Sequence, residues 1–126
     1  MIILMAVLAA AMLATLVATA SAEGQATIYI YRLSGLVGDN RGEPVFIDGR
    51  MLGQNSQRTF LVTHVSAGHH TVATTTSSLT LDADVGKAYF IRQQHSVWNA
   101  TSSIGRVTEE EGKKGVRACK RAAELF

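Results

Sequence analysis

Short runs of alternating apolar and polar residues, separated by loop-forming residues, make up most of the chain after residue 25. The runs are rich in Val, Ile, Thr, Tyr and Phe, and Gly, Asp, Asn and Ser gather between them. This pattern is typical of the strands of an all-β domain. The first run, Ala26–Leu33, alternates two isoleucines with two tyrosines, so both of its faces are apolar. We therefore expect a central strand there.

Six further runs form three pairs, and a short loop that contains glycine separates the members of each pair. The pairs are Pro44–Ile47 with Arg50–Leu52, Thr59–Val65 with His69–Thr76, and Ser78–Asp84 with Lys87–Gln94. The first loop, Asp48-Gly49, suits a two-residue turn with positive φ, and the second, Ser66-Ala67-Gly68, suits a type I turn followed by a left-handed glycine. The pattern predicts three β-hairpins, followed by a further strand at Ser103–Val107.

The end of the chain departs from the strand pattern. Thr108 and Glu111 have the spacing of a capping box, and acidic residues precede basic ones in the order that suits a helix dipole. A narrow apolar stripe contains Val116, Cys119, Ala123 and Phe126. Gly112 and Gly115 each cost about 1 kcal/mol relative to alanine, so we expect the helix to need docking against the sheet. The prediction is an all-β, antiparallel β-sandwich with one C-terminal α-helix from about residue 108.

The first 22 residues carry no charged side chain and end in Ala20-Ser21-Ala22, as a secretory signal peptide does. We expect cleavage before Glu23, which leaves residues 23–126 as a single domain in the periplasm or outside the cell. An uncleaved anchor is the alternative, because about 20 apolar residues can span a bilayer. Only in that case would the chain contact a membrane.

Charge and cysteine content exclude several classes of function. The 12 Lys and Arg residues and 10 Asp and Glu residues are scattered along the chain, so we expect no nucleic-acid partner. Cys119 is the single cysteine, which excludes an internal disulfide and favours burial of its thiol. Neither G-x-S-x-G, S-x-x-K nor a phosphate-binding glycine loop occurs. We therefore expect no enzymatic activity, no catalytic residue and no cofactor.

Histidines are the candidates for metal chemistry. If the second hairpin forms as predicted, His64 lies opposite His70 while His69 points to the other side. Opposed residues have Cβ atoms about 5 Å apart, so the two imidazoles could share a metal ion. A zinc site needs at least one more protein ligand, which would have to come from His95, Asp82 or Asp84. The alternative is that His64 and His70 border an apolar face and form hydrogen bonds within the sheet.

The ordered motifs IYIYR, PVFIDGRMLGQ, VSAGHHTV, LTLDADVGKAYFIR and VTEEEGKKGVRACK together resemble a family of small exported bacterial proteins with a domain of unknown function. They are similar, more loosely, to the PEGA-type β modules of cell-envelope proteins. In that family one motif reads roughly Val-x-Pro-Gly-x-His-x-Val, which Gly68, His70 and Val72 match, while Ala67 replaces the proline. The resemblance implies a transthyretin-like or PEGA-like sandwich and no known catalytic activity. Many members resemble lipoproteins, but no cysteine follows the apolar segment here.

These features predict an exported envelope protein that acts as a non-catalytic binding or structural module. Its partner would be another envelope protein or a cell-wall component. The alternative function is that of a periplasmic metal-binding protein that uses His64 and His70.

Overall fold

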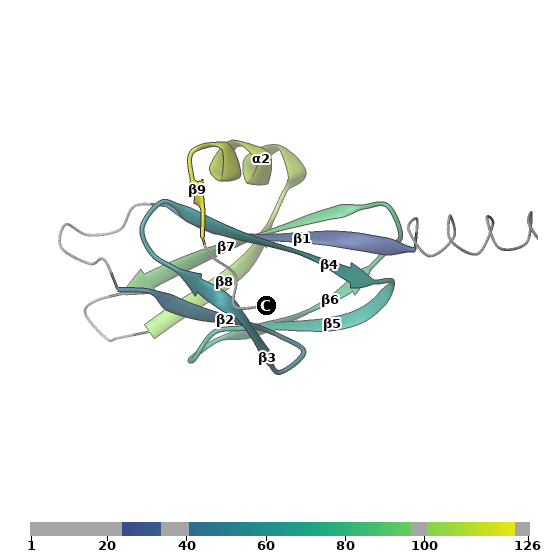
Figure 1. Cartoon of the computed structure of the whole chain (residues 1–126), viewed down its shortest axis with the longest axis horizontal. Coiled ribbons are helices and arrows are strands. Elements are labelled where there is room, and N and C mark those ends of the chain that lie inside the picture. The colour runs from purple at the N-terminus through teal and green to yellow at the C-terminus, as the bar shows by residue number, and fades with distance from the viewer. Residues whose placement is uncertain (1–23, 34–40, 97–100, 123–126) are drawn as a thin grey trace, which may run out of the picture.

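A computed structural model describes residues 24–33, 41–96 and 101–122, and shows two β-sheets packed against each other with one helix outside (Figure 1). The larger sheet contains β1 (Gln25–Arg32), β4 (Thr59–Ser66), β7 (Ala88–Ser96), β8 (Thr101–Val107) and β9 (Lys120–Arg121) in the order β8-β7-β1-β4-β9. The smaller sheet contains β2 (Glu43–Ile47), β3 (Arg50–Asn55), β5 (Gly68–Ala73) and β6 (Ser78–Ala83) in the order β3-β2-β5-β6. The helix α2 spans Glu109–Arg117. The predicted β-sandwich with a C-terminal helix is confirmed.

The first strand is central, as its two apolar faces predict. Ile28 and Ile30 of β1 are fully buried between the sheets, and Tyr31 is buried on the opposite face. β1 is antiparallel to β4 but parallel to β7, and β4 is parallel to β9. The larger sheet is therefore mixed, whereas the sequence pattern predicted only antiparallel pairs.

The first predicted hairpin is present and the other two are wrong. β2 and β3 pair across Asp48-Gly49, where φ values of 51° and 84° suit a two-residue turn. β4 pairs with β1 and β9, whereas β5 pairs with β2 and β6, so the chain changes sheets at Ala67. It changes sheets again across Val85-Gly86, because β6 pairs with β5 while β7 pairs with β1 and β8. The runs were identified correctly, but consecutive strands are neighbours in a sheet only about two-thirds of the time.

The apolar core lies between the sheets and draws on alternate residues of both. It contains Ala26, Ile28, Ile30, Val45, Leu52, Leu61, Val72, Leu81, Ala83, Tyr89 and Ile91. The same inward-facing rows become polar toward one end of the sandwich. The row on β1 ends with Arg32, and the row on β7 continues from Ile91 to Gln93, both of these polar side chains being buried.

The start of α2 follows the sequence prediction closely. Thr108 is the N-cap, and its Oγ1 accepts a hydrogen bond of 3.2 Å from the backbone N–H of Glu111. Glu109 and Lys113 form the predicted i,i+4 ion pair at 2.8 Å. The helix ends at Arg117, so the predicted apolar stripe is not continued through Cys119 on the helix. Ala123 and Phe126 lie outside the described residues.

Two glycines form the surface through which α2 docks on the larger sheet. A Cβ at Gly112 would lie 2.2 Å from Cβ and Cγ of Phe90, and a Cβ at Gly115 would lie 2.3 Å from the ring of Tyr31. Both glycines are buried, and α2 lies along the outer face of the sheet in Figure 1. Only glycine permits this approach. The residues that weaken the helix in isolation are therefore the ones that let it pack.

The signal-peptide prediction for residues 1–22 falls outside the described residues. Within the part of the chain that the structure describes, no helix is long and apolar enough to cross a bilayer.

Candidate functional site

The structure places the two histidines of the metal hypothesis in different sheets. His64 lies on β4 and is exposed, with its Nδ1 3.1 Å from Oγ1 of Thr27. His70 lies on β5, opposite Leu81 of β6, and is buried. The predicted opposition of His64 and His70 is therefore wrong, because their strands do not pair. Among residues 24–33, 41–96 and 101–122, no group of three His, Cys, Asp or Glu side chains could hold a metal ion.

The side chain of His70 on β5 forms a hydrogen bond with the turn between β2 and β3. Its Nδ1 lies 2.6 Å from Oδ2 of Asp48, and its Nε2 lies 2.7 Å from the carbonyl oxygen of Ser66. Both partners are acceptors, so both ring nitrogens donate and the imidazolium form fits the site. The hydrogen bond from His70 to Asp48 raises the pKa of His70, and the bond to the Ser66 carbonyl adds to the increase. In turn, the hydrogen bonds from His70 and the backbone N–H of Thr71 lower the pKa of Asp48.

The other candidate metal ligands have partners of their own. Nδ1 of His69 lies 2.7 Å from Oδ1 of Asp82, with both side chains more than two-thirds exposed. Asp84 forms an exposed ion pair with Lys87 at 3.7 Å. Exposed pairs of this kind contribute little to stability. The polar end of β6 is therefore a solvated surface.

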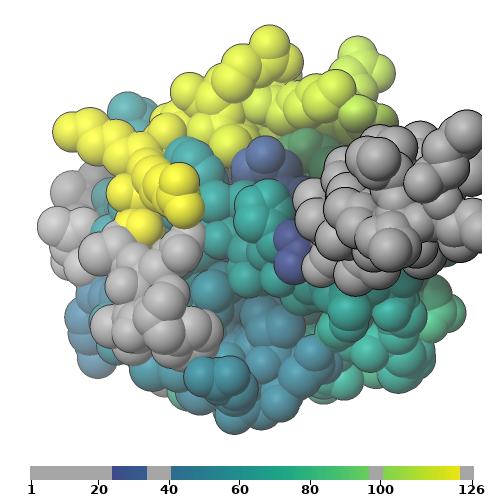
Figure 2. Space-filling view, turned by 45° about the vertical axis from the view of Figure 1, so that its right-hand side comes forward, coloured from purple at the N-terminus to yellow at the C-terminus, as the bar shows by residue number. Residues whose placement is uncertain are grey.

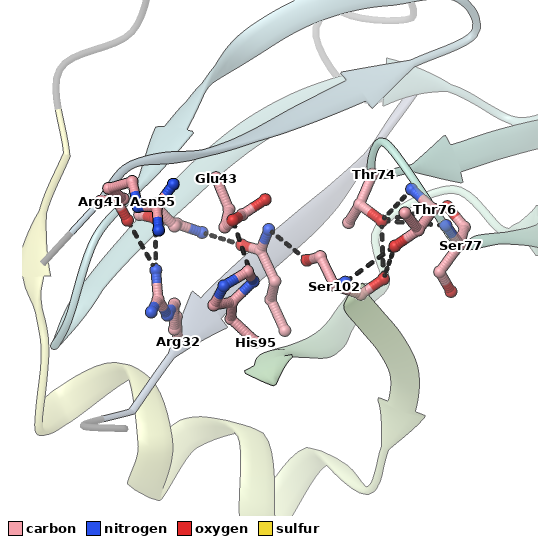
Figure 3. A network of polar contacts seen from close by, with 10 residues as sticks. Arg32, Arg41, Glu43, Asn55, Thr74, Thr76, Ser77, His95 and Ser102 are labelled. Atoms are coloured by element: carbon pink, nitrogen blue, oxygen red, sulfur yellow. Dashed lines mark hydrogen bonds and ion pairs between the residues drawn. The ribbon is translucent and has the colours of Figure 1, made fainter. Parts of the chain in front are cut away.

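A buried polar network occupies the end of the sandwich where β1 finishes (Figure 3). Asn55 is fully buried, and its Nδ2 donates to the carbonyl oxygen of Ile30 at 3.0 Å and to Oε1 of Gln93 at 3.2 Å. Arg32 is 2% exposed and donates to the carbonyl oxygens of Arg41 at 2.9 Å and Asn55 at 3.2 Å. These contacts join β1 and β7 of the larger sheet to β3 of the smaller one.

The same network continues to β8 at the edge of the larger sheet, because Nε2 of Gln93 donates to Oγ of Ser102 at 3.4 Å. Ser102 is buried, and its carbonyl oxygen accepts hydrogen bonds from Oγ1 of Thr74 at 3.0 Å and of Thr76 at 2.7 Å. The backbone N–H of Ser102 donates to Oγ1 of Thr76 at 2.8 Å. The turn between β5 and β6 therefore closes one side of the sandwich by covering the β8 edge, which would otherwise be open to pairing.

A histidine and a carboxylate lie at the rim of this network. Nδ1 of His95 is 2.9 Å from Oε1 of Glu43, and their side chains are 8% and 13% exposed. Figure 3 shows the pair between Arg32 and Ser102. The amide and guanidinium donors of the network already have acceptors, which removes most of the penalty for burying them. These buried polar contacts therefore hold the two sheets together.

Sequence reasoning missed this network, although the alternation of the strands contained the signal. On β1, every second residue from Ile28 faces the core, and Arg32 is one of these residues. On β7, Gln93 and His95 lie on the same face of the strand as Ile91. A polar residue in the inward phase of a strand needs a buried partner, so these positions point to a polar interior.

A groove of about 320 Å³ runs beside α2 on the outer face of the larger sheet. Its lining residues are Tyr29, Ala88, Phe90, Lys113, Val116 and Arg117. The rings of Tyr29 and Phe90 stack with centroids 5.0 Å apart and planes inclined by 5°. Figure 2 shows the surface of β1, in purple, between α2 in yellow and the teal strands. The groove therefore has an aromatic floor and a helical wall that carries two cations.

Cys119 is half-buried rather than fully buried, and its Sγ donates to the carbonyl oxygen of Arg32 at 3.5 Å. Burial raises the pKa of this thiol. A raised pKa lowers the thiolate fraction at neutral pH, and the thiolate is the reactive form. Cys119 is therefore poorly suited to act as a nucleophile.

Residues 22–106 match the family model described as "Protein of unknown function (DUF2846)". The chain belongs to this family. The match covers the strands from β1 into β8 and ends before α2, so the helical wall of the groove lies outside the matched range. The prediction of a family with a domain of unknown function is confirmed, while these matches include no PEGA module.

One curated relative of this DUF2846 protein is an "Uncharacterized protein" of Haemophilus influenzae. The two are 32% identical over 100 residues, which cover 75% of this chain and 59% of the relative. The chain therefore spans about three-fifths of that relative's length. No solved structure matches the chain significantly.

Proposed function

We propose that this protein is an exported, non-catalytic binding module of the bacterial cell envelope. The observation that carries the proposal is the groove beside α2, which combines stacked aromatic rings with exposed cationic side chains. Its volume of about 320 Å³ falls at the lower end of the range for small-molecule sites. The ligand or partner would come from the envelope, either from a protein or from a cell-wall component.

Export is supported by the uncharged apolar residues 1–22 and by the small residues of Ala20-Ser21-Ala22. A non-catalytic role is supported by the raised pKa of the Cys119 thiol. It is also supported by the buried amides of Asn55 and Gln93, which contact each other rather than an open cavity. The buried polar network joins the two sheets, as suits a scaffold for a surface site.

Fractionation of cells that express the full chain tests export. We expect the protein in the fluid released from the periplasm by osmotic shock, with Glu23 as its first residue. Recovery in the membrane fraction with Met1 retained would instead support the anchor. Recovery in the cytosol with Met1 retained would overturn the proposal of export.

Native mass spectrometry of the protein purified from the periplasm tests the binding site. We expect a bound species that is lost in Ala88→Trp, because Ala88 lines the groove and is exposed, so an indole there fills it. Val85→Trp is the matched control, because Val85 is also exposed but does not line the groove. Equal retention of the bound species by both variants would rule out this groove as the binding site.

A further inference from the structure

We propose that the groove beside α2 binds a small organic anion that has an apolar body and one negatively charged head. This inference rests on the proposed function, since it names the ligand chemistry of the same groove. The body would lie on the aromatic floor and the head at the basic wall.

The floor of the groove fits an apolar body. Phe90 is 4% exposed and packs against Gly112 of α2, so it forms a fixed base beneath the more accessible ring of Tyr29. Tyr29 stacks on Phe90 and is only partly buried, which leaves some of its ring accessible. Val116 closes the side toward the helix, while the small side chain of Ala88 leaves space. Stacked and preformed apolar surfaces of this kind bind rings and chains without much rearrangement.

The wall of the groove fits a negative head. Lys113 and Arg117 are exposed and lie one turn apart on α2, both lining the groove. Nε of Arg117 donates to the carbonyl oxygen of Lys113 at 3.2 Å, which orients the guanidinium. Nζ of Lys113 is 2.8 Å from Oε1 of Glu109, so its charge is already balanced.

Arg117 therefore supplies most of the attraction for an anion. Within the described parts of the chain, no carboxylate forms an ion pair with its guanidinium. An exposed arginine beside an apolar groove offers a planar set of donors to a carboxylate, sulfonate or phosphate head. The positive charge and the apolar floor lie within one groove, which selects a ligand that has both a negative group and an apolar body.

The surroundings of the groove favour a small molecule over a bilayer. Among the residues that the structure describes, Val85 is the single large apolar side chain that is exposed, at 52%. Insertion into a membrane surface requires a broad apolar face, which these residues do not form. A groove of about 320 Å³ instead matches one compact ligand.

Fluorescence titration with anilinonaphthalene sulfonate, an aromatic anion, tests the inference. We expect Arg117→Gln to weaken its binding about fivefold, the factor for losing one exposed charge contact. Lys114→Gln is the matched control, because Lys114 is an exposed cation of the same helix that does not line the groove. It should change the affinity less than twofold. Sodium decanoate should displace the probe and uncharged decanol should do so at least fivefold less well.

The outcomes separate this inference from the proposed function. If Ala88→Trp abolishes binding while Arg117→Gln matches Lys114→Gln, the groove binds ligands but does not select anions, and the inference fails alone. If Ala88→Trp also leaves binding unchanged, the groove is not the site and both proposals fail. Thermal unfolding of each variant within about 3 °C of the unmodified protein shows that a loss of binding is not a loss of fold.

Two further measurements address other occupants of the groove. Sedimentation with phosphatidylglycerol vesicles should leave the protein in solution, and binding that depends on Arg117 would point to a lipid surface instead. Light scattering should give the same mass across a hundredfold range of concentration. Self-association that Ala88→Trp prevents would identify a second copy as the occupant and overturn the inference.

Discussion

Replacing Gly112 with alanine tests whether α2 is held by close packing or by its own helical propensity. Propensity alone predicts that alanine stabilises the helix by about 1 kcal/mol. The structure predicts the opposite, because the added Cβ would lie 2.2 Å from two atoms of Phe90. Ordinary contact begins at 3.4 Å, so α2 and the sheet must separate by about 1 Å. The clash includes Cβ of Phe90, whose position is fixed by the backbone, so a change of rotamer cannot relieve it.

Overpacking of this kind costs about 1–3 kcal/mol. After subtraction of the propensity gain, we expect Gly112→Ala to lower the free energy of unfolding by about 1 kcal/mol. Urea denaturation followed by circular dichroism measures the change. Gly105→Ala is the control, because a Cβ at that exposed position of β8 meets no atom within 4 Å and should have little effect. A Gly112→Ala protein that is more stable than the unmodified one by about 1 kcal/mol would refute the packing argument.

Three other predictions concern the polar contacts of the sandwich. The pKa of His70 is raised and that of Asp48 is lowered. The stabilisation from their ion pair is therefore fully present between about pH 4 and pH 6.5, the ordinary pKa values of the two groups. It is lost as the pH rises through the folded pKa of His70 or falls through that of Asp48. His70→Gln should therefore cost about 1 kcal/mol at pH 5.5 and less at pH 8.5, and urea denaturation that shows an equal cost at both would contradict the imidazolium assignment. Asn55→Ala should lower the free energy of unfolding by about 3 kcal/mol, because it leaves buried acceptors unpaired. The control Gln54→Ala, at an exposed position, should lower it by less than about 0.5 kcal/mol. Similar unfolding midpoints for the two variants would argue against a stabilising role of the buried polar network. Alkylation of Cys119 by iodoacetamide at pH 7.5 should be at least about tenfold slower in the folded protein than in urea, given its raised pKa and half-buried thiol; equal rates would show an accessible thiolate.

Local features of this fold could be read from the sequence, because they depend on neighbouring residues. The Asp48-Gly49 turn requires positive φ at two positions, and the Thr108 cap requires a side-chain acceptor at one position. Both follow from the residue types alone. The positions of the strand runs and of α2 were accordingly predicted well.

Strand partners could not be read in the same way. The loop at Ala67 is short enough for a hairpin, yet it carries the chain into the other sheet. Gly68 has a φ of 126°, which the hairpin interpretation also anticipated as a left-handed glycine. The positive φ is therefore compatible with both paths. The choice depends on how β4 fits beside β1, and that fit involves residues far apart in the sequence.

The candidate site was missed for related reasons. The groove beside α2 joins Tyr29 and Phe90 to Arg117, and no spacing in the sequence links these residues. The glycines of α2 predict a weak helix that needs docking, but the sequence does not show that they permit the close approach to Phe90 and Tyr31. The metal hypothesis paired His64 with His70 across a predicted hairpin, whereas the structure places His64 beside Thr27 and His70 beside Asp48.

The central place of β1 has a consequence for how the chain folds during synthesis. β1 is the first of the described strands to be made, but its neighbours are β4 and β7, and Thr27 of β1 lies opposite Ala88. The larger sheet therefore cannot form around its own centre until most of the chain is available. Pairings between such distant segments slow folding, because a long loop must close before any contact forms. A nascent chain with this topology cannot complete the larger sheet until β7 has been synthesised, a delay that is compatible with the export proposed above.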